Sequence, residues 1–509
     1  MSKGVVYLVG AGPGDPKLIT IRGLEAIQRA DVVVYDRLAS PRLLKHMKPG
    51  AEKIFVGKLP DKHMMKQGEI NQLLVDLAMQ GKTVTRLKGG DPSVFGRVGE
   101  EAELLADNGI MFEIVPGITS AIAVPTYAGI PVTHRDFTSS FSIVTGHEYP
   151  NKTYSSLNWD NLSQASGTLI FLMGVANLEF ICSQLIQGGK SPSTPVALIR
   201  WGTWMDQKTL TGTLTDIVEK VRSANFQSPA VIIVGEVVKL RGKLAWFEKK
   251  PLFGRRILVT RARSQASDLV QQIEELGGEA VEFPVIRTQA PAKPEALQNL
   301  DAALSRLSVF DWILFTSVNG VEYFFQRLQA NRIDVRTMSN ARIAAVGPKT
   351  SEALAQRGLI AEELPAKFQG DELLASFAEE LKPGQHVLLP TADIAKEYIP
   401  AKLKQMGLQV TEVDVYETVL DTSGGAEIID LLKENIIHTI TFTSSSTVTN
   451  LIIALEQLGI DKPLELLQQS KIACIGPMTA KTVEEAGLKV DYLAKEATVS
   501  SLVQSLYCE

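Results

Sequence analysis

Two glycine-rich turns in the first half of the chain carry the residues best suited to hold a small ligand. Gly10-Ala-Gly12-Pro-Gly14-Asp15 follows one short apolar run, and Gly89-Gly90-Asp91-Pro92 follows another. Glycine lets a ligand approach the backbone closely, and a carboxylate such as Asp91 can accept a hydrogen bond from an amine or a ribose hydroxyl. The first turn matches the dinucleotide fingerprint only loosely, because its third glycine comes one position early. The second could equally be a tight turn in which Asp91 caps the following helix.

Cysteine and histidine are sparse and scattered, which limits the chemistry expected of the chain. Cys182, Cys474 and Cys508 lie far apart and none forms a CxxC pair, so neither structural zinc nor a disulfide framework is expected. His134 and His147 have no ligand-like neighbours and are expected to be hydrogen-bonded structural histidines. We therefore predict no metal site.

The composition is that of an ordinary globular protein. The chain has 509 residues, of which 45% are apolar and 21% charged, and its net charge is −5; this length predicts three or four domains. No Lys/Arg-rich stripe indicates a nucleic-acid partner. No apolar run reaches the roughly 18 residues of a membrane span, and residues 1–10 begin a strand rather than a signal peptide. We expect a soluble cytoplasmic protein without a membrane partner.

Short apolar runs alternate with amphipathic stretches, and this alternation predicts an α/β fold with largely parallel sheets. The first expected strands lie at 5–10, 32–35, 83–87 and 112–115, with helices at 24–30, 69–80 and 99–108. The pattern resets near residue 116, so we predict domains at 1–115 and 116–245. Residues 239–256 are rich in charge and predict a solvated linker to residues 255–509.

The second half contains an internal sequence repeat. Phe315-Thr316-Ser317 is matched by Phe442-Thr443-Ser444, and Gly347-Pro348 is matched in the same order by Gly476-Pro477. Two similar α/β domains are the natural interpretation, although strand-to-helix junctions with Gly-Pro could also recur by chance.

Five motifs of the first half closely resemble those of the uroporphyrinogen-III C-methyltransferase family. They are GAGPGDPKLITIRGLEAIQRADVVVYDRL, VGK, RLKGGDPSVFGRVGEE, VPGITSAIAVPTYAGIPVTHRD and VTGHE, within residues 3–248. The resemblance implies the two-domain tetrapyrrole-methylase fold, with S-adenosylmethionine bound in the cleft between the domains, and a homodimer formed through this half. It assigns donor-binding roles to Pro13, Gly89, Gly90, Asp91, Val94, Thr119, Ser120, Met173, Gly202 and Ala230.

The same resemblance assigns Asp36 as proton acceptor and Lys58 as proton donor. The sulfonium of the donor is already activated, so alignment of the methyl carbon with the nucleophilic ring carbon would dominate the rate. Methylation places positive character on a pyrrole nitrogen, and a carboxylate such as Asp36 could remove its proton. Because the substrate carries many carboxylates, Arg37 and Arg97 are candidate clamps, with ordinary solvated surface cations as the alternative.

Shorter motifs of the second half resemble uroporphyrinogen-III synthase. They are RILVTR, FPVI, FTSVNGV, AAVGPKT, VYETV, FTSSSTV and ACIGPMT. The resemblance implies two flavodoxin-like domains with a two-stranded connection, one combining about 255–290 with about 420–509 and the other spanning about 291–417. It also implies closure of hydroxymethylbilane to uroporphyrinogen III.

Such a synthase needs to fold a linear tetrapyrrole and help hydroxide leave, so no strong nucleophile is required. Tyr416 matches a tyrosine proposed to assist the leaving hydroxyl. Candidates for holding the substrate are Arg261, Ser317, Lys349, Thr443 and Ser444. Helix N-termini could bind carboxylates there, but the hydroxyl side chains could equally be simple helix caps. Met478 replaces the counterpart of Lys349, so the two repeats cannot bind an anion in the same way.

The two halves predict consecutive steps of one pathway. We predict cyclisation followed by two methylations to precorrin-2, on the branch to sirohaem or cobalamin. Two alternatives stay open. The first half could methylate another macrocycle position, an rRNA or a protein, and the second half could be an idle module that delivers the tetrapyrrole.

Overall fold

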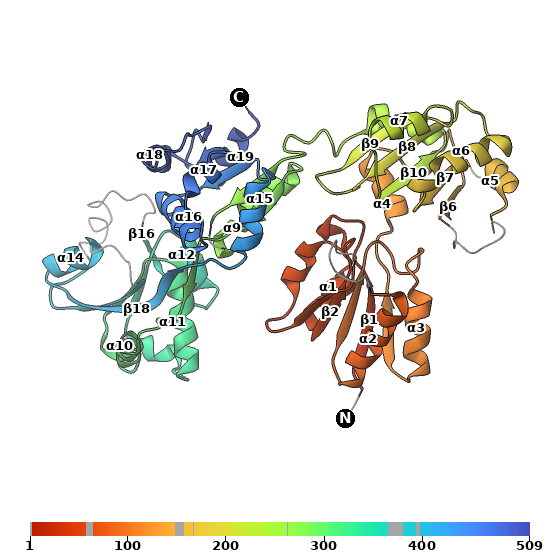
Figure 1. The fold of residues 1–509 in the computed structure, drawn as a ribbon. Helices are drawn as coiled ribbons and strands as arrows, with labels where there is room; N and C mark the ends of the chain where they lie inside the picture. Colours follow the sequence, from red (N-terminus) through yellow and green to blue (C-terminus); the bar gives the residue numbers. More distant parts are fainter. Residues whose placement is uncertain are drawn as a thin grey trace. The chain divides into compact units, whose positions relative to one another are not determined.

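The computed structural model describes residues 3–57, 65–147, 157–165, 167–261, 263–364, 380–392 and 398–508. The chain divides into two compact units (Figure 1). The first comprises Met1–Arg255 with Ile273–Glu279, and the second comprises Arg256–Gln272 with Ala280–Glu509. Every helix within the described ranges is too short or too polar to span a bilayer.

The first sheet of the first unit consists of parallel strands in the order β3-β2-β4-β1-β5. These strands are β1 (Val5–Gly10), β2 (Val32–Tyr35), β3 (Glu52–Phe55), β4 (Val84–Lys88) and β5 (Met111–Val115). Helices α2 (Gln67–Met79) and α3 (Val98–Asp107) cover one face, and α1 (Ile21–Arg29) covers the other. Successive strand residues face opposite sides, so Leu8 packs with α2 and α3 while Val9 packs with α1. Burial on both faces explains the apolar runs of β1 and β2, whereas the edge strands β3 and β5 are partly exposed.

The second sheet of this unit is mixed rather than largely parallel. Its order is β6-β7-β10-β8-β9, in which only the β6–β7 pair is parallel. The strands are β6 (Phe141–Thr145), β7 (Thr168–Leu172), β8 (Pro195–Arg200), β9 (Lys208–Thr213) and β10 (Ala230–Val234). The loop from β8 to β9 is too short for a parallel crossover, which needs a dozen or more residues.

Helices again cover both faces of this second sheet. α4 (Ser120–Tyr127) follows β5 and packs on one face, and α6 (Leu178–Gln187) and α7 (Ile217–Ser223) pack on the other. A further helix, α5 (Trp159–Ala165), precedes β7. Because α4 joins the two sheets, its first turn lies where both can contribute residues to one site.

Residues 239–256 are not the solvated linker that we predicted. A 3-10 helix (Glu236–Leu240) and α8 (Arg241–Leu244) are followed by Phe247, which is only 8% exposed, and by the fully buried Leu252. The ring of Phe247 lies 4.8 Å from that of Tyr127 on α4. The expectation failed because a few apolar side chains are interspersed among many charges, and the average composition hides them.

The second unit contains two sheets. One has the order β12-β11-β19-β20-β21, and the other has the order β13-β18-β17-β14-β15-β16. Its strands are β11 (Arg256–Val259), β12 (Glu279–Glu282), β13 (Ile286–Gln289), β14 (Trp312–Phe315), β15 (Arg342–Val346), β16 (Glu362–Leu364), β17 (His386–Ala392), β18 (Gln409–Leu420), β19 (Thr439–Phe442), β20 (Lys471–Cys474) and β21 (Tyr492–Leu493). β13 and β18 pair antiparallel where the chain leaves the first of these sheets and returns. The residue boundaries of the predicted domains stay predictions.

Both sheets of the second unit carry the repeated strand-to-helix junctions. β14 leads into α11 (Val318–Ala330) as β19 leads into α16 (Ser445–Gln457), and β15 leads into α12 (Pro348–Ala355) as β20 leads into α18 (Pro477–Glu485). The other helices are α9 (Arg263–Glu275), α10 (Pro294–Leu304), α14 (Tyr398–Gln405), α15 (Gly425–Lys433), α17 (Pro463–Leu467) and α19 (Val499–Ser505). Gly347 has a φ of +83°, a conformation that favours glycine. Its counterpart Gly476 has a φ of −174°, which is extended backbone. The two Gly-Pro junctions therefore share their topology but differ in local conformation, whereas Ser317 and Ser444 at the other junction have nearly the same extended backbone.

Candidate functional site

A cavity of about 590 Å³ lies in the first unit, at one edge of both sheets. Most residues lining it lie on or directly after β4, β7 and β8, after β1 and β2, or at the start of β10. It contains ten of the residues that we predicted to act on or bind a ligand: Pro13, Asp36, Gly89, Gly90, Val94, Arg97, Ser120, Met173, Gly202 and Ala230. Open α/β sheets bind ligands beyond the carboxyl ends of their strands, and this volume is usual for small-molecule sites.

The two glycine-rich turns meet at the floor of the cavity. The Gly90 N–H donates to the Gly12 carbonyl at 2.7 Å, and the Gly12 N–H donates to the Gly90 carbonyl at 3.2 Å. Gly90 has a φ of +71°, which side chains rarely permit. A Cβ on Gly10 would lie 2.6 Å from the backbone of Gly117. The floor is therefore bare main chain, which leaves room for a ligand.

Asp91 and Thr119 support this floor and do not line the cavity. Asp91 Oδ1 accepts from the Ser93 N–H at 2.7 Å, and its Oδ2 accepts from the Gly117 N–H at 2.9 Å. Thr119 caps α4 by accepting from the Ala121 N–H at 3.3 Å. Both Asp91 oxygens thus hold the turn together, as the tight-turn interpretation predicts, but Asp91 does not cap the following helix, because α3 begins after Arg97.

Asp36, the residue directly after β2, presents a fixed carboxylate to the cavity. Its Oδ1 accepts from the Leu38 N–H at 3.0 Å, and its Oδ2 accepts from Arg86 Nη2 at 3.1 Å. The side chain is 26% exposed. Each oxygen keeps a free lone pair after these bonds, so an oriented carboxylate of this kind can accept a proton from a bound ligand.

A cluster of buried charges, which the sequence analysis missed, lies behind Asp36. Arg86 and Lys88 are on the fully buried strand β4, and both line the cavity. Glu101 of α3 is completely buried, and its Oε1 accepts from Lys88 Nζ at 2.6 Å and from Gln67 Nε2 at 3.1 Å. Arg86 Nε lies 3.5 Å from the same oxygen. The missed signal was two cations within the short strand Val84–Lys88.

The electrostatics of this cluster are dominated by burial. Burial lowers the pKa of Lys88 below its ordinary value, and the Glu101 carboxylate opposes part of that shift. Ions removed from water are tolerated only when they are paired. Glu101 is thus the counter-charge that allows two cations, Arg86 and Lys88, to stay in the cavity wall.

The opposite wall of the cavity is a strained loop, residues 201–204, between β8 and β9. Trp201 and Thr203 have positive φ angles of 47° and 72°, and a Cβ on Gly202 would lie 2.3 Å from Val124. The Arg37 guanidinium lies over the Trp201 ring at 5.5 Å. Residues held in this backbone region each cost about 1–3 kcal/mol, so surrounding contacts must fix them. Of the eight non-glycine residues with positive φ in the described chain, four line this cavity: Phe95, Arg97, Met173 and Trp201.

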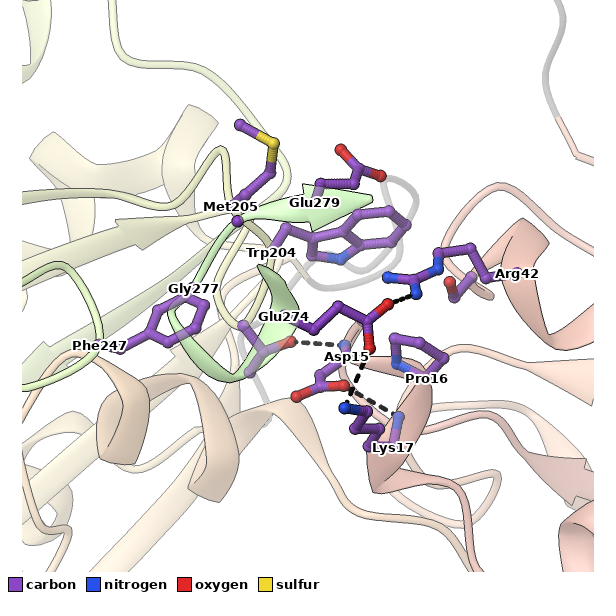
Figure 2. Close-up of a pocket in the computed structure, with 14 residues that line it drawn as sticks. Asp15, Pro16, Lys17, Arg42, Trp204, Met205, Phe247, Glu274, Gly277 and Glu279 are labelled. Atoms are coloured by element: carbon purple, nitrogen blue, oxygen red, sulfur yellow. Dashed lines mark hydrogen bonds and ion pairs between the residues drawn. The ribbon is translucent and has the colours of Figure 1, made fainter. Parts of the chain in front are cut away.

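The turn after β1 is tied to the same loop (Figure 2). The Asp15 N–H donates to Thr203 Oγ1 at 3.0 Å, and Asp15 Oδ1 accepts from the Lys17 N–H at 2.9 Å. Asp15 Oδ2 accepts from the Tyr127 hydroxyl at 2.9 Å. A Cβ on Gly14 would lie 1.9 Å from Trp204 Nε1. This turn, which carries Pro13, and the loop at 201–204 therefore form one continuous wall.

The remaining predicted residues of the first half are distributed as follows. Lys58 lies outside the described residues, so its role stays a prediction. Arg97 lines the cavity and pairs with Glu100 at 2.7 Å, and His147 also lines it. His134 Nδ1 accepts from the Asp136 N–H at 3.2 Å. Across the described ranges, no group of three His, Cys, Asp or Glu side chains could hold a metal ion.

In the second unit, the structure brings Tyr416 and Ser317 together. Their hydroxyl oxygens lie 3.3 Å apart, and Ser317 also caps α11 by accepting from the Gly320 N–H at 2.9 Å. Tyr323, which the sequence analysis missed, stacks on Tyr416 with ring centroids 5.7 Å apart. Its own hydroxyl donates to the Thr288 carbonyl at 2.7 Å. The Tyr416 ring is therefore held on one face and at its hydroxyl.

The other predicted residues of this unit lie elsewhere. Thr443 and Ser444 follow β19, and Arg261 follows the neighbouring parallel strand β11, so all three belong to the same sheet edge. The Ser444 N–H donates to Thr447 Oγ1 at 3.4 Å, in the manner of a helix cap. Lys349 is exposed in the first turn of α12.

Comparison with known proteins relates each half to one family. Residues 5–218 match the tetrapyrrole (corrin/porphyrin) methylases, and residues 267–504 match uroporphyrinogen-III synthase HemD. The porphyrin biosynthesis protein HemD of Ruminiclostridium josui is 41% identical over 510 residues, covering 99% of this chain and 98% of that protein. The uroporphyrinogen-III C-methyltransferase of Bacillus subtilis is 40% identical over 481 residues, covering 94% and 93%. The crystal structure of uroporphyrin-III C-methyl transferase from Thermus thermophilus, complexed with S-adenyl homocysteine, is 37% identical with a TM-score of 0.41 and covers 47% of this chain and 100% of its own.

Proposed function

We propose that this chain, which belongs to the family of uroporphyrinogen-III C-methyltransferases fused to uroporphyrinogen-III synthase, converts hydroxymethylbilane into precorrin-2. Its two activities are an S-adenosylmethionine-dependent methyl transfer and a cyclising lyase reaction of tetrapyrrole biosynthesis. The single observation that carries it is the oriented Asp36 carboxylate in a cavity that the glycine-rich turns leave open.

The cavity suits the methyl donor in two respects. Its floor is main chain at Gly89 and Gly90, where a nucleoside can lie against the backbone, and apolar residues such as Met173 and Ala230 line the other side. When bound, S-adenosylmethionine supplies an electrophilic methyl group on its sulfonium. Pro13, Val94, Ser120 and Gly202 would hold this donor, while Asp91 and Thr119 would keep the floor in shape.

Asp36 would act on the macrocycle. As a ring carbon takes the methyl group, positive character develops on the pyrrole nitrogen, and the Asp36 carboxylate accepts the N–H proton. Arg86 holds that carboxylate in place. The family resemblance assigns Lys58 as a proton donor, and Arg37 and Arg97 would bind substrate carboxylates. Two such cycles on uroporphyrinogen III would give precorrin-2.

In the synthase half, Tyr416 would donate a hydrogen bond to the hydroxyl that leaves hydroxymethylbilane, with Ser317 as its partner. The resulting azafulvene is reactive by itself, so the protein mainly has to hold the chain in a folded form. Arg261, Lys349, Thr443 and Ser444 would bind its carboxylates. Precorrin-2 serves both sirohaem and cobalamin, and we propose that other enzymes of the cytoplasm carry out the later steps.

We also propose that the methyltransferase half forms a homodimer. Its edge strand β5 exposes apolar side chains on both faces, including Met111, which is 75% exposed, and Ile118 and Ile122 continue the exposed apolar residues into α4. Unpaired apolar edge strands seek a partner in solution. Sedimentation of the wild type and of Met111→Lys would test this proposal, with a dimer expected only for the wild type.

One anaerobic experiment tests the proposed reactions. The purified chain is given hydroxymethylbilane with and without S-adenosylmethionine, and the products are followed by absorbance and mass. We expect uroporphyrinogen III without the donor and a doubly methylated product with it. Closure to the non-inverted isomer, with methylation only of added uroporphyrinogen III, would make the second half a delivery module. Absence of any methylated tetrapyrrole would overturn the substrate of the first half.

A further inference from the structure

Glu248 lies at the end of the first unit, just before the synthase half, yet it is the centre of a hydrogen-bond network. Its Oε1 accepts from Gln207 Nε2 at 2.8 Å and from Thr209 Oγ1 at 2.7 Å, and its Oε2 pairs with Arg241. The side chains of Glu248 and Arg241 are each 19% exposed. Arg241 also donates to the Ala128 carbonyl at 2.6 Å, at the end of α4. A carboxylate with this many partners is an anchor and not a solvated linker residue.

The network reaches the wall of the methyl-transfer cavity through one amide. Gln207 Oε1 accepts from the Thr203 N–H at 2.9 Å, and both residues are 4% exposed. A glutamine amide has a donor end and an acceptor end. Because the Glu248 carboxylate can only accept, it binds the donor end of Gln207 and directs the acceptor end toward Thr203.

Thr203 belongs to the strained loop at residues 201–204. Its φ of 72° and the φ of 47° at Trp201 are unfavourable for these residue types. Trp201, Gly202 and Trp204 of this loop line the cavity. The Thr203 N–H bond to Gln207 is thus one of the contacts that keep the loop in its cavity-lining conformation.

Residues 246–248 also support the loop at residues 201–204 through Tyr127 of α4. The ring of Tyr127 packs against Trp246 and Phe247 with centroids at 5.0 and 4.8 Å. The Tyr127 hydroxyl donates to Asp15, whose N–H donates to Thr203 Oγ1 at 3.0 Å. Residues 246–248 therefore brace both edges of one wall.

We propose that Glu248 is a positioning residue for methyl transfer, which acts through Gln207 to hold the loop at residues 201–204 against the methyl donor. This inference rests on the proposed binding of S-adenosylmethionine in the cavity. In this role, the segment that precedes the synthase half contributes to methyl-donor binding in the first half. Loss of the Glu248 charge would let the Gln207 amide turn over and the strained loop relax, so the donor would bind less tightly while chemistry in bound complexes continued.

The test is Glu248→Gln, measured in the full-length chain. We expect the Kd of S-adenosylhomocysteine and the KM for S-adenosylmethionine to rise about tenfold, as for loss of a charge-assisted hydrogen bond, with kcat within about threefold of the wild type. Tryptophan fluorescence reports that the first unit is folded, since four of the five tryptophans lie there, and cyclisation of hydroxymethylbilane reports the same for the second unit. Glu236→Gln, which removes an exposed carboxylate paired with Lys239 at 2.6 Å, is the matched control and should change neither constant.

A reciprocal exchange separates positioning from general stability. Gln207→Glu places two carboxylates against each other and should weaken donor binding further. The double variant Gln207→Glu with Glu248→Gln restores one carboxylate facing one amide, so it should recover at least part of the donor affinity. If Glu248→Gln does not fold, Thr209→Val removes one of the three donors to Glu248 and should raise the KM about twofold to threefold.

The outcomes are distinct. An unchanged Kd and KM in Glu248→Gln, or no recovery in the double variant, would overturn the positioning role. A wild type that binds S-adenosylhomocysteine without methylating uroporphyrinogen III would contradict the proposed function but not this inference, which the Kd alone then decides. A wild type that does not bind S-adenosylhomocysteine would overturn both.

Discussion

The methyltransferase half encloses its cavity with buried charges and strained backbone, whereas the synthase half presents hydroxyl groups at the strand ends of two separate sheets. In the first, Arg86, Lys88 and Glu101 are almost completely buried around one wall, and Trp201 is held at an unfavourable φ. In the second, Ser317 and Tyr416 meet at one sheet while Ser444 caps a helix of the other. Most of these residues lie on or directly after parallel strands, whereas Tyr416 lies within β18.

The difference follows from what each reaction asks of the protein. Methyl transfer joins two separate molecules, so the rate depends on a preformed geometry that strain and buried ion pairs can maintain. Cyclisation starts from one flexible molecule whose leaving group departs readily, and a few oriented hydrogen bonds are enough.

The largest effect is expected for Asp36→Asn. An amide cannot accept the pyrrole proton, so the rate of methylation should fall about 10²–10⁴-fold, while cyclisation by the same chain stays unchanged. Assays of both activities on one preparation measure this. Asp76→Asn, at an exposed position of α2, is the control. Equal rates for Asp36→Asn and the wild type would remove Asp36 from the reaction.

The second prediction concerns the buried charges. Glu101→Leu removes the carboxylate that pairs with Lys88 and leaves Arg86 paired with Asp36 alone, and the free energy of unfolding of the first unit should fall by about 3–5 kcal/mol. Urea unfolding followed by tryptophan fluorescence reports this, since four of the five tryptophans lie in that unit. Glu100→Gln breaks an exposed pair with Arg97 and should cost less than about 1 kcal/mol. Equal losses of unfolding free energy in the two variants would show that the buried Glu101 stabilises the first unit no more than an exposed carboxylate does.

A smaller effect is expected in the synthase half. Tyr416→Phe removes one hydrogen bond, so cyclisation should slow about tenfold and more of the non-inverted isomer should form by spontaneous closure. Methylation of added uroporphyrinogen III should not change. Separation of the two isomers by chromatography gives the ratio. Tyr507→Phe, near the end of the chain, is the control, and a wild-type isomer ratio in Tyr416→Phe would argue that this site does not assist the leaving group.

The smallest effect is a pH dependence at Glu248. Burial alone would raise its pKa, but hydrogen bonds from Gln207, Thr209 and Arg241 outweigh burial and hold the pKa below the ordinary value. A lowered carboxyl pKa contributes stability above the unfolded value of about 4.3, and this is lost as the pH falls through the folded pKa. The Tm difference between the wild type and Glu248→Gln should therefore be largest near neutral pH and shrink in acid. A difference independent of pH would contradict this account.

Much of the fold and part of the site could be predicted from local patterns. The uninterrupted apolar runs identified β1, β2, β4 and β5, and the glycine-rich turns gave the cavity floor, because these signals depend on residues close together in the chain. The repeat of Phe315-Thr316-Ser317 at Phe442-Thr443-Ser444 predicted similar strand-to-helix junctions in the two sheets of the second unit. The proposed roles of Tyr416 and Asp36 were predicted only from the family resemblance of the motifs that contain them.

Other features needed the tertiary structure, because they join residues that no local pattern connects. Arg86 meets Glu101 only when α3 packs across β4, and Tyr323 reaches Tyr416 only when α11 lies on β18. Charge in the sequence predicted a solvated segment around Glu248, whereas folding surrounds that carboxylate with three donors. The sequence by itself determined the elements, the turns and the family. The tertiary structure decided which charges are buried and what they hold, since burial and pairing exist only once distant segments have packed together.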